Sequence, residues 1–304
     1  MPDSQTTPRV TVVIPAYNEA MNIGDLVAKT RRVVAPDDEI LVVDDGSDDG
    51  TGDRARRAGA TVVRHPYRMG NGASVKTGLR LARGTILVMM DGDGQHNPDD
   101  IPRLLEPLGP VDMVVGARIG ASQSDVHRRF ANRFYNLFAS YLTNRPILDT
   151  TSGFRAVKTR MARRFIYLLP NAFSYPTTLT MAMIRAGHSV SFIPIVTFRR
   201  GGRSKLRPVR DGVRFLIIMF KIATLYAPIK VFVPVSGVFF LVGLGYYIYT
   251  YLEFHRFTNM SALLFINAVL IFLMGLVSEQ IAQMRFERSE ALEREDEDSA
   301  TPLR

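Results

Sequence analysis

The chain has 304 residues, of which 46% are apolar and 22% charged, with a net charge of +9 and neither cysteine nor tryptophan. The lack of cysteine excludes disulfides and thiolate metal sites, and the positive charge favours a partner that carries phosphate, such as anionic lipid, nucleic acid or a phosphorylated substrate. The N-terminal sequence MPDSQTTPRV has no apolar signal segment, so we expect the first part of the chain to fold without being exported.

From residue 9 to about residue 200, apolar runs alternate with segments of helical periodicity. Strands are predicted from RVTVVIP, EILVVDD, ATVVRH, GTILVMM and VDMVVGAR, and helices from MNIGDLVAKTRRVV, NGASVKTGLRLARG and PDDIPRLLEPL. This alternation predicts an α/β domain with a largely parallel sheet, in which ligands bind at the carboxyl ends of the strands. Polar residues follow three of these strands, at Tyr17 to Glu19, at Asp44 and Asp45, and at Asp91 and Asp93.

Asp91 and Asp93 lie on either side of a glycine directly after an apolar run. The glycine lets the backbone turn, so that both carboxylates can face one point. Hard divalent cations prefer oxygen ligands, and Mg²⁺ often uses one or two carboxylates together with substrate phosphates. Gln95 or His96 could supply a third ligand. Aspartates are also common in turns, so the motif by itself leaves a purely structural role open.

Two long apolar segments follow residue 228. Residues 231–252 carry no charge, and residues 260–282 carry none before Glu279. At about 1.5 Å per residue, a helix of this length crosses a hydrocarbon core of about 30 Å. With only EFHRFTN between them, the segments predict a transmembrane hairpin, and two buried core helices are the alternative. Basic residues before the first segment, and Arg285 and Arg288 after the second, favour placing both ends in the cytoplasm.

The remaining C-terminal segments complete the predicted organisation. Residues 207–228 have apolar residues at helical spacing and basic residues on another face, which predicts an amphipathic helix at the membrane surface or an ordinary packed helix. Residues 285–304 are charged and predict a solvated helix end that fades into disorder. We therefore expect a catalytic domain over residues 1–206, the amphipathic helix over 207–228, two membrane helices within 229–284 and a charged tail over 285–304.

Seven motifs occur in one order along the chain: VVIPAYNEA, VVDDGSDDGT, GNGASVKTGL, MDGDGQHNP, GAR, DTTSGFRA and GGRSKL. In this order they resemble the family-2 inverting glycosyltransferases with a GT-A fold. The similarity is greater to the polyprenyl-phosphate glycosyltransferases, a group that includes dolichol-phosphate mannose synthase and bactoprenol glucosyltransferases. The resemblance covers about residues 8 to 206, and the predicted hairpin agrees with it.

The resemblance implies a role for each matching position. It assigns the donor nucleotide to Pro15, Tyr17, Glu19, Asp45, Asp91, Arg203 and Lys205. It assigns a metal ion, Mg²⁺ or Mn²⁺, to Asp91, Asp93 and Gln95. It assigns the acceptor phosphate to Arg118, Arg128, Arg129, Asn132 and Ser152, although the spacing between GAR and HRR varies in the family, and Arg128 and Arg129 alone are typical of a solvated helix face. It makes Asp93, Asp149 and Arg118 the catalytic residues.

The reaction implied is transfer of a hexose from a nucleotide-diphosphate sugar to a polyprenyl (undecaprenyl or dolichyl) monophosphate at the cytoplasmic face of the membrane. The QH after the acidic motif slightly favours GDP-mannose, with UDP-glucose next. A UDP-N-acetylhexosamine, a modified sugar or a different acceptor is the alternative. Thr177 and Thr178 occupy a segment where many relatives have an acidic residue, which leaves the sugar open. A homo-oligomer is also possible.

Other classes of protein fit the sequence less well. A processive polysaccharide synthase would carry a Gln-x-x-Arg-Trp motif, which a chain without tryptophan cannot have. A nucleotidyltransferase would use paired aspartates but would not explain TSGFRA or the hairpin. A non-catalytic scaffold would be expected to lose the acidic motif, which is present. A nucleic-acid binder would account for the charge, but the cationic residues gather near the apolar segments, so lipid phosphate is the better partner.

Overall fold

The computed structural model describes residues 9–118, 126–171, 175–198 and 220–300, except for the side chains of residues 126–132, 285, 286 and 288–300. The chain forms two compact units, residues 1–204 and 205–304. The bounds of the four segments expected from the sequence stay predictions. Of the segment 207–228, the structure describes a short helix over residues 220–226, and residues 207–219 lie outside the described part.

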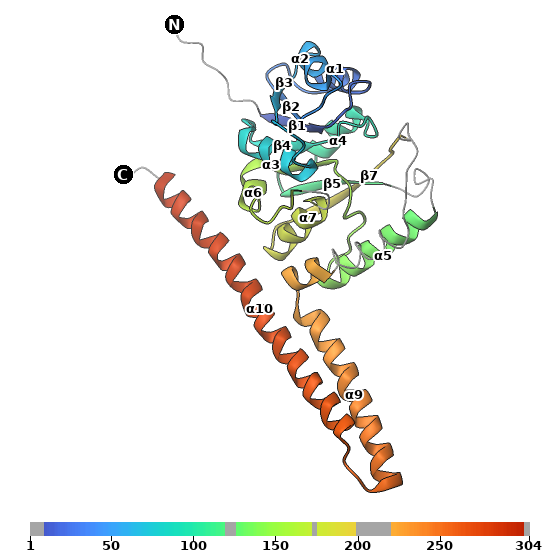
Figure 1. Ribbon diagram of the computed structural model, residues 1–304. Helices are drawn as coiled ribbons and strands as arrows, with labels where there is room; N and C mark the ends of the chain where they lie inside the picture. Colours follow the sequence, from blue (N-terminus) through green and yellow to red (C-terminus); the bar gives the residue numbers. More distant parts are fainter. Residues whose placement is uncertain (1–8, 119–125, 172–174, 199–219, 301–304) are drawn as a thin grey trace. The chain divides into compact units, whose positions relative to one another are not determined.

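One sheet of seven strands runs through the first unit in the order β3-β2-β1-β4-β6-β5-β7 (Figure 1). The strands are β1 (Val10–Ala16), β2 (Glu39–Asp44), β3 (Thr61–Arg64), β4 (Ile86–Met89), β5 (Met113–Arg118), β6 (Arg155–Lys158) and β7 (Val190–Ile195). Strand β6 is antiparallel to β4 and β5, and the other pairings are parallel. The carboxyl ends of the parallel strands therefore meet at the edge where β6 begins. The α/β fold expected from the sequence is confirmed.

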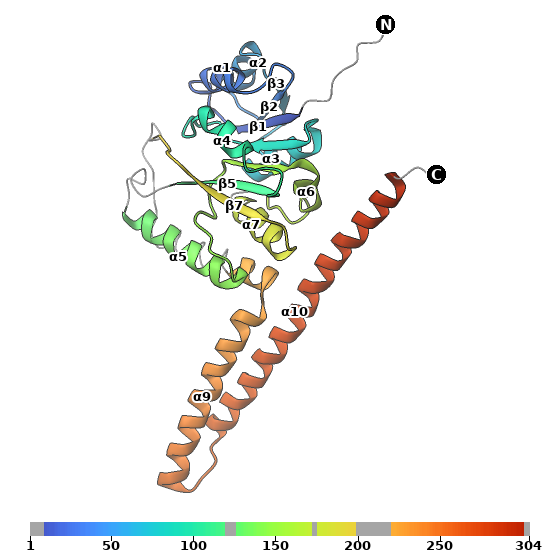
Figure 2. The same cartoon turned by 180° about the vertical axis from the view of Figure 1, so that it is seen from behind.

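Helices cover both faces of this sheet, as the opposite views in Figures 1 and 2 show. The helices described in the first unit are α1 (Ile23–Val33), α2 (Thr51–Arg57), α3 (Asn71–Leu81), the short 3₁₀ turn η1 (Pro98–Asp100), α4 (Ile101–Leu105), α5 (Val126–Thr143), α6 (Thr159–Arg164) and α7 (Tyr175–Arg185), and α5 lies apart from the sheet. Val12 and Ile14 of β1 pack in one core cluster with Ile23 of α1 and Leu104 of α4. Because side chains alternate along a strand, Val13 points to the other face.

The other face of β1 is where α3 approaches the sheet. A Cβ built on Gly78 of α3 would lie 2.3 Å from Cγ1 of Val13. Only a residue without a side chain allows this distance, so Gly78 sets how closely α3 packs. Asn71, the first residue of α3, is consequently held close to the carboxyl edge of the sheet, where the polar residues lie.

Two long helices make up most of the second unit: α9 (Ile229–Phe254) and α10 (Asn259–Ala300). Both contain stretches long and apolar enough to cross a membrane, at Ile229–Phe254 and Asn259–Met284. Many of their large apolar side chains face outward, as Leu241 and Leu252 do at 66% and 70% exposure, which suits lipid and not a protein core. The predicted apolar hairpin is confirmed.

The second helix of the hairpin is longer than expected. The sequence predicted a span of residues 260–282 followed by a tail fading into disorder, whereas α10 continues to Ala300. The reason is the composition of the tail: glutamate, arginine, alanine and leucine are good helix formers, and acidic and basic residues there recur at helical spacing.

Candidate active site

The acidic motif continues the pairing of β4 with β1 beyond the end of the strand. The backbone N–H of Met90 donates to the carbonyl of Val13 at 3.1 Å, and that of Gly92 donates to the carbonyl of Pro15 at 3.2 Å. A Cβ on Gly92 would come within 2.9 Å of the same carbonyl oxygen. Asp91 is therefore fixed beside the end of β1, as the rule for strand ends predicted.

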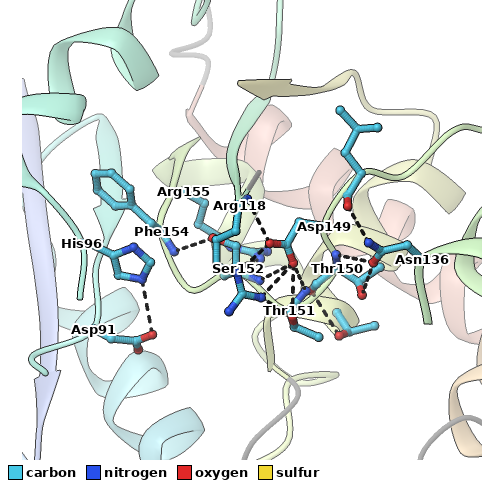
Figure 3. Close-up of polar contacts among 12 residues, drawn as sticks. Asp91, His96, Arg118, Asn136, Asp149, Thr150, Thr151, Ser152, Phe154 and Arg155 are labelled. Atoms are coloured by element: carbon cyan, nitrogen blue, oxygen red, sulfur yellow. Dashed lines mark hydrogen bonds and ion pairs between the residues drawn. The ribbon is translucent and has the colours of Figure 1, made fainter. Parts of the chain in front are cut away.

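The Asp91 carboxylate is surrounded by three contacts from other segments. Nδ2 of Asn71 lies 3.4 Å from Oδ1, Nε2 of His96 lies 3.8 Å from Oδ2, and Gly153 lies so close that a Cβ there would be 2.4 Å from Oδ2. Figure 3 shows His96 between Asp91 and Phe154, and the His96 ring stacks on that of Phe154 with centroids 5.1 Å apart. Burial raises the pKa of Asp91, but His96 and Asn71 outweigh it and lower the pKa, so the site presents an anion.

Two buried polar atoms beside this carboxylate have no hydrogen-bond partner among the described residues: Oδ1 of Asn71 and Nδ1 of His96. The Asp91 side chain itself is 31% exposed. Farther along the turn, Oδ1 of Asp93 accepts a hydrogen bond from the backbone N–H of Gln95 at 3.1 Å. The carboxylate oxygens of Asp91 and Asp93 thus lie in a partly exposed turn near the amide of Asn71. Among the described residues, no donor contacts Oδ1 of Asn71.

This donor set fits a hard divalent cation that also binds substrate phosphate. Within the described part of the chain, no three side chains of His, Cys, Asp or Glu are close enough to hold a metal ion by themselves. Mg²⁺ commonly uses only one or two carboxylates and completes its shell with water and phosphate oxygens. Asp91, Asp93 and Gln95 therefore stay predicted metal ligands, of a kind that the chemistry of the turn allows.

Arg118, at the end of β5, is held by Asp149 through a two-point contact (Figure 3). Nε donates to Oδ2 at 2.8 Å and Nη2 donates to Oδ1 at 3.0 Å. Although burial opposes both charges, the hydrogen bonds between the two groups raise the pKa of Arg118 and lower that of Asp149. The charge of Arg118 also helps to lower the pKa of Asp91, so the cation and the acidic turn belong to one electrostatic environment.

The loop between α5 and β6 wraps around Asp149. The carboxylate accepts hydrogen bonds from the backbone N–H groups of Thr151 at 3.0 Å and Ser152 at 3.1 Å. The Ser152 side chain, predicted to hold acceptor phosphate, is buried, and its hydroxyl accepts from the N–H of Phe154 at 3.3 Å. The Ser152 hydroxyl therefore makes a hydrogen bond within its own loop. The next residue, Gly153, packs directly against the Asp91 carboxylate.

Arg155 is completely buried at the start of β6. Its guanidinium donates to the carbonyl of Ser152, to the carbonyl of Pro176 at 2.8 Å and to the hydroxyl of Thr180 at 3.1 Å. Burial lowers the pKa of Arg155. This side chain fastens the 149–153 loop to α7, so it holds Gly153 in place against the acidic turn.

The residues predicted to hold the nucleotide lie at the ends of β1 and β2. Tyr17 is 37% exposed, whereas Asp45 is only 3% exposed. Both carboxylate oxygens of Asp45 accept hydrogen bonds from backbone N–H groups, those of Met69 and Gly70, each at 2.8 Å. Asp45 therefore shapes the loop before α3, and direct contact with a nucleotide stays a prediction. Glu19 begins the turn into α1, where its carbonyl accepts from the N–H of Ile23 at 2.9 Å.

Some predicted site residues cannot be placed. Arg203 and Lys205 lie outside the described residues, and for Arg128, Arg129 and Asn132 the structure describes the helix backbone of α5 but no side chain. Conversely, the structure places near the predicted site four residues for which the sequence predicted no role. They are His65, Arg68, Asn71 and Tyr175. Asn71 could have been predicted from the sequence, because it follows a glycine at the start of a helix that comes after a strand.

Comparison with known proteins agrees with this arrangement. Residues 11–168 match the family described as glycosyl transferase family 2, and residues 227–284 match the one described as the GtrB C-terminal hairpin. An undecaprenyl-phosphate mannosyltransferase of Micrococcus luteus is 31% identical over 213 residues, covering 65% of this chain and 87% of its own. A polyprenol monophosphomannose synthase of Mycolicibacterium smegmatis is 32% identical over 234 residues, covering 71% and 86%.

A solved structure shares the fold of the first unit. Glucosyl-3-phosphoglycerate synthase from Mycobacterium tuberculosis, in complex with Mn²⁺, UDP and phosphoglyceric acid, superposes with a TM-score of 0.57 at 23% identity, covering 71% of this chain and 78% of its own. At this identity the likeness establishes the fold alone. The GT-A architecture expected from the motifs is thereby confirmed.

Proposed function

Because this chain belongs to glycosyltransferase family 2, we propose that it transfers a hexose from a nucleotide-diphosphate sugar to a polyprenyl monophosphate at a membrane surface. The names of the two bacterial relatives, an undecaprenyl-phosphate mannosyltransferase and a polyprenol monophosphomannose synthase, support this acceptor. The match to the GtrB hairpin supports it as well, since a lipid acceptor requires an enzyme that stays at the bilayer.

The proposal rests on one observation: negatively and positively charged side chains lie close together at one edge of the sheet. The carboxylates of Asp91 and Asp93 follow β4, and the guanidinium of Arg118 follows β5 and acts on the pKa of Asp91. A transfer between two phosphate compounds must bring two anions together. An acidic side that binds a metal and a cationic side that binds phosphate directly would achieve this.

Asp91, Asp93 and Gln95 would hold Mg²⁺ or Mn²⁺, and such an ion, when bound, supplies positive charge to the diphosphate of the donor. The protein's own contribution is to keep this turn anionic and rigid. Asn71 and His96 keep the pKa of Asp91 low, and the hydrogen bonds from Met90 and Gly92 to β1 fix its position.

On the acceptor side, Arg118 would orient the lipid phosphate while Asp149 holds the guanidinium in place. A phosphate monoester is already an anion at neutral pH, so the attack needs no strong general base. In the transfer, a phosphate oxygen of the acceptor forms a bond to the anomeric carbon as the bond from that carbon to the nucleoside diphosphate breaks. The nucleoside diphosphate leaves as an anion, and the configuration inverts. Catalysis then consists of positioning and charge stabilisation.

We place both ends of the hairpin, and with them the first unit, on the cytoplasmic side. Lys221 lies in the short helix over residues 220–226 and Lys230 at the start of α9, whereas the connector between α9 and α10 carries a single arginine, Arg256. Segments rich in lysine and arginine stay in the cytoplasm. The nucleotide sugar and the lipid phosphate would therefore meet at the inner face of the membrane.

The donor that we favour is GDP-mannose, followed by UDP-glucose, because QH follows the acidic motif and both relatives carry mannose in their names. The test is a panel assay with purified protein, Mg²⁺ or Mn²⁺, undecaprenyl or dolichyl phosphate, and one labelled nucleotide sugar at a time. Label that enters the lipid phase with a single donor identifies the reaction and the sugar. Transfer only from a UDP-N-acetylhexosamine, or only to another acceptor, would select the alternative reading.

A further inference from the structure

The turn that carries the predicted metal ligands, residues 91–95 (the metal turn), receives a hydrogen bond from a distant part of the chain. The backbone N–H of Phe198 donates to the carbonyl of Gln95 at 2.9 Å. Gln95 follows β4, whereas Phe198 follows β7, and β6 and β5 lie between these two strands in the sheet. At about 4.8 Å from strand to strand, β4 and β7 are about 14 Å apart, so the sheet alone does not bring the two residues together.

The end of β7 is fixed just before this contact. Ile195, its last residue, is 1% exposed and pairs with Arg118 of β5. From α4, Nη2 of Arg103 donates to the carbonyl of Pro194 at 3.0 Å. The segment 196–198 therefore starts from a fixed point beside the cation that we assign to the acceptor phosphate.

Beyond Ile195, core packing no longer holds the chain. Val196 and Phe198 are 69% and 58% exposed. Among the described residues, the backbone N–H of Thr197 has no hydrogen-bond acceptor. The segment is therefore attached to the metal turn through its backbone, and the hydrogen bond from Phe198 to Gln95 provides the attachment.

Within the metal turn, the backbone of Gln95 is held on both sides. Its N–H donates to Oδ1 of Asp93 at 3.1 Å, and its carbonyl accepts from Phe198. The peptide bond that contains this carbonyl leads to His96, whose Nε2 lies 3.8 Å from Oδ2 of Asp91. The orientation of the Gln95 carbonyl therefore affects the placement of Asp93 on one side and of His96 on the other.

We propose that Phe198 is a positioning residue, whose backbone N–H fixes the metal turn at a set distance from Arg118. This inference rests on the proposed function, since it takes Asp93 and Gln95 as ligands of the metal ion that accompanies the donor. Residues 195–198 then join the two charged sides of the site, because they start beside Arg118 and end on Gln95. Since linked equilibria are reciprocal, a metal ion that binds the ordered turn also stabilises the hydrogen bond from Phe198.

The test measures binding of Mn²⁺ in the presence of GDP and, separately, of UDP, by calorimetry on the full-length protein in detergent. Phe198→Pro removes the N–H donor and should weaken Mn²⁺ binding by about three- to tenfold, the effect of one hydrogen bond. Thr197→Pro is the matched control, because it places the same ring one residue earlier, where no hydrogen bond among the described residues is lost. It should leave Mn²⁺ binding unchanged. Phe198→Ala keeps the N–H and should bind Mn²⁺ as the unaltered protein does.

A second measurement needs no variant and separates positioning from a general loss of structure. In the unaltered protein, Mn²⁺ with the nucleoside diphosphate should slow hydrogen exchange at the amide of Phe198, because opening of this hydrogen bond then competes with metal binding. Exchange that does not change on addition of Mn²⁺ would contradict the coupling.

Two further results would overturn the positioning role and leave the proposed function intact. They are an Mn²⁺ affinity of Phe198→Pro equal to that of the unaltered protein, and equal weakening by Phe198→Pro and Thr197→Pro. Failure of the unaltered protein to bind Mn²⁺ with either nucleoside diphosphate would instead count against the proposed function.

Discussion

Arg118 and Asp149 are joined at three points: Nε to Oδ2 at 2.8 Å, Nη2 to Oδ1 at 3.0 Å, and the backbone N–H of Arg118 to Oδ2 at 3.2 Å. The contact ties the end of β5 to the loop before β6. The Asp149 side chain is 5% exposed and that of Arg118 is 23% exposed. The cation that we assign to the acceptor phosphate is therefore positioned by a buried anion, and neither can be removed without consequence for the other.

We predict that Arg118→Met lowers the free energy of unfolding by about 3 kcal/mol, because it leaves Asp149 buried without its cation. Arg118→Met combined with Asp149→Asn should recover part of this loss, since no uncompensated charge then remains. Both variants should lack transferase activity. Chemical denaturation followed by circular dichroism measures the stabilities of the unaltered protein, Arg118→Met, Asp149→Asn and the double variant. Simple addition of the two single effects would show that the pair is not coupled.

Gly153→Ala should impair the acidic turn without unfolding the protein. The new Cβ would lie 2.4 Å from Oδ2 of Asp91, a partly exposed side chain that can rotate away from it. We expect activity to fall at least about tenfold, since displacement of a site by about 1 Å has large effects on rate, with a small change in melting temperature. Gly24→Ala is the control, because nothing lies within 4 Å of its Cβ position in α1. Full activity of Gly153→Ala would show that Asp91 need not hold its present position.

The sequence was sufficient to predict the position of Asp91 but not its neighbours. The alternation of Val12 and Val13 to opposite faces, and the polar residues after β1 and β4, are local patterns that follow from strand geometry. The contact of Gly153 with Asp91 arises because β6 inserts antiparallel between β4 and β5. That pairing joins segments far apart in the chain, and no local pattern specifies it.

Asp45 illustrates the opposite difficulty. The family resemblance assigned both Asp45 and Asp91 to the donor nucleotide, and each follows an apolar strand. In the structure, Asp45 is buried by a loop that it holds through Met69 and Gly70, whereas Asp91 stays partly exposed. The difference depends on the path of the loop after β3, which the sequence pattern leaves open.

Asp93→Ala should abolish transfer while the protein keeps its fold. Asp93 is a predicted metal ligand, and its side chain lies half-buried in a turn outside the hydrophobic core. We therefore expect a loss of at least about a hundredfold in kcat with an unchanged circular dichroism melting curve. Asp53→Ala removes an exposed carboxylate of α2 as the control. Normal turnover of Asp93→Ala with added Mg²⁺ or Mn²⁺ would remove Asp93 from the metal site.

Acid should weaken the first unit through Asp112, which joins the starts of β5 and β7. Burial raises the pKa of Asp112, but hydrogen bonds from Lys158 at 2.8 Å and from Ser189 outweigh it and hold the pKa at about 2. Because this value lies below that of the unfolded chain, the stabilisation is complete above about pH 5 and is lost as the pH falls toward 2.

Protonation of Asp112 lowers the free energy of unfolding by about 2 kcal/mol. We predict that Asp112→Asn melts several degrees below the unaltered protein at pH 6 and that the difference narrows at pH 3. Melting temperatures at a series of pH values provide the measurement. A difference that stays constant over this range would mean that the carboxylate charge is not what stabilises the junction.

The hairpin should depend on close contact between α9 and α10. A Cβ on Gly275 would lie 2.6 Å from Cβ of Phe232, so Gly275→Leu cannot fit without separating the helices. The hydroxyl of Ser236 donates to the carbonyl of Ala268 at 2.7 Å, which identifies a point of contact. Since the chain has no cysteine, Ser236→Cys with Ala268→Cys gives a cross-linking pair without background. We expect efficient oxidation of this pair, a strong decrease when Gly275→Leu is added, and no decrease with Gly237→Leu, because nothing lies within 4 Å of a Cβ at Gly237. Equal yields with both leucine variants would show that glycine is not what brings the helices together.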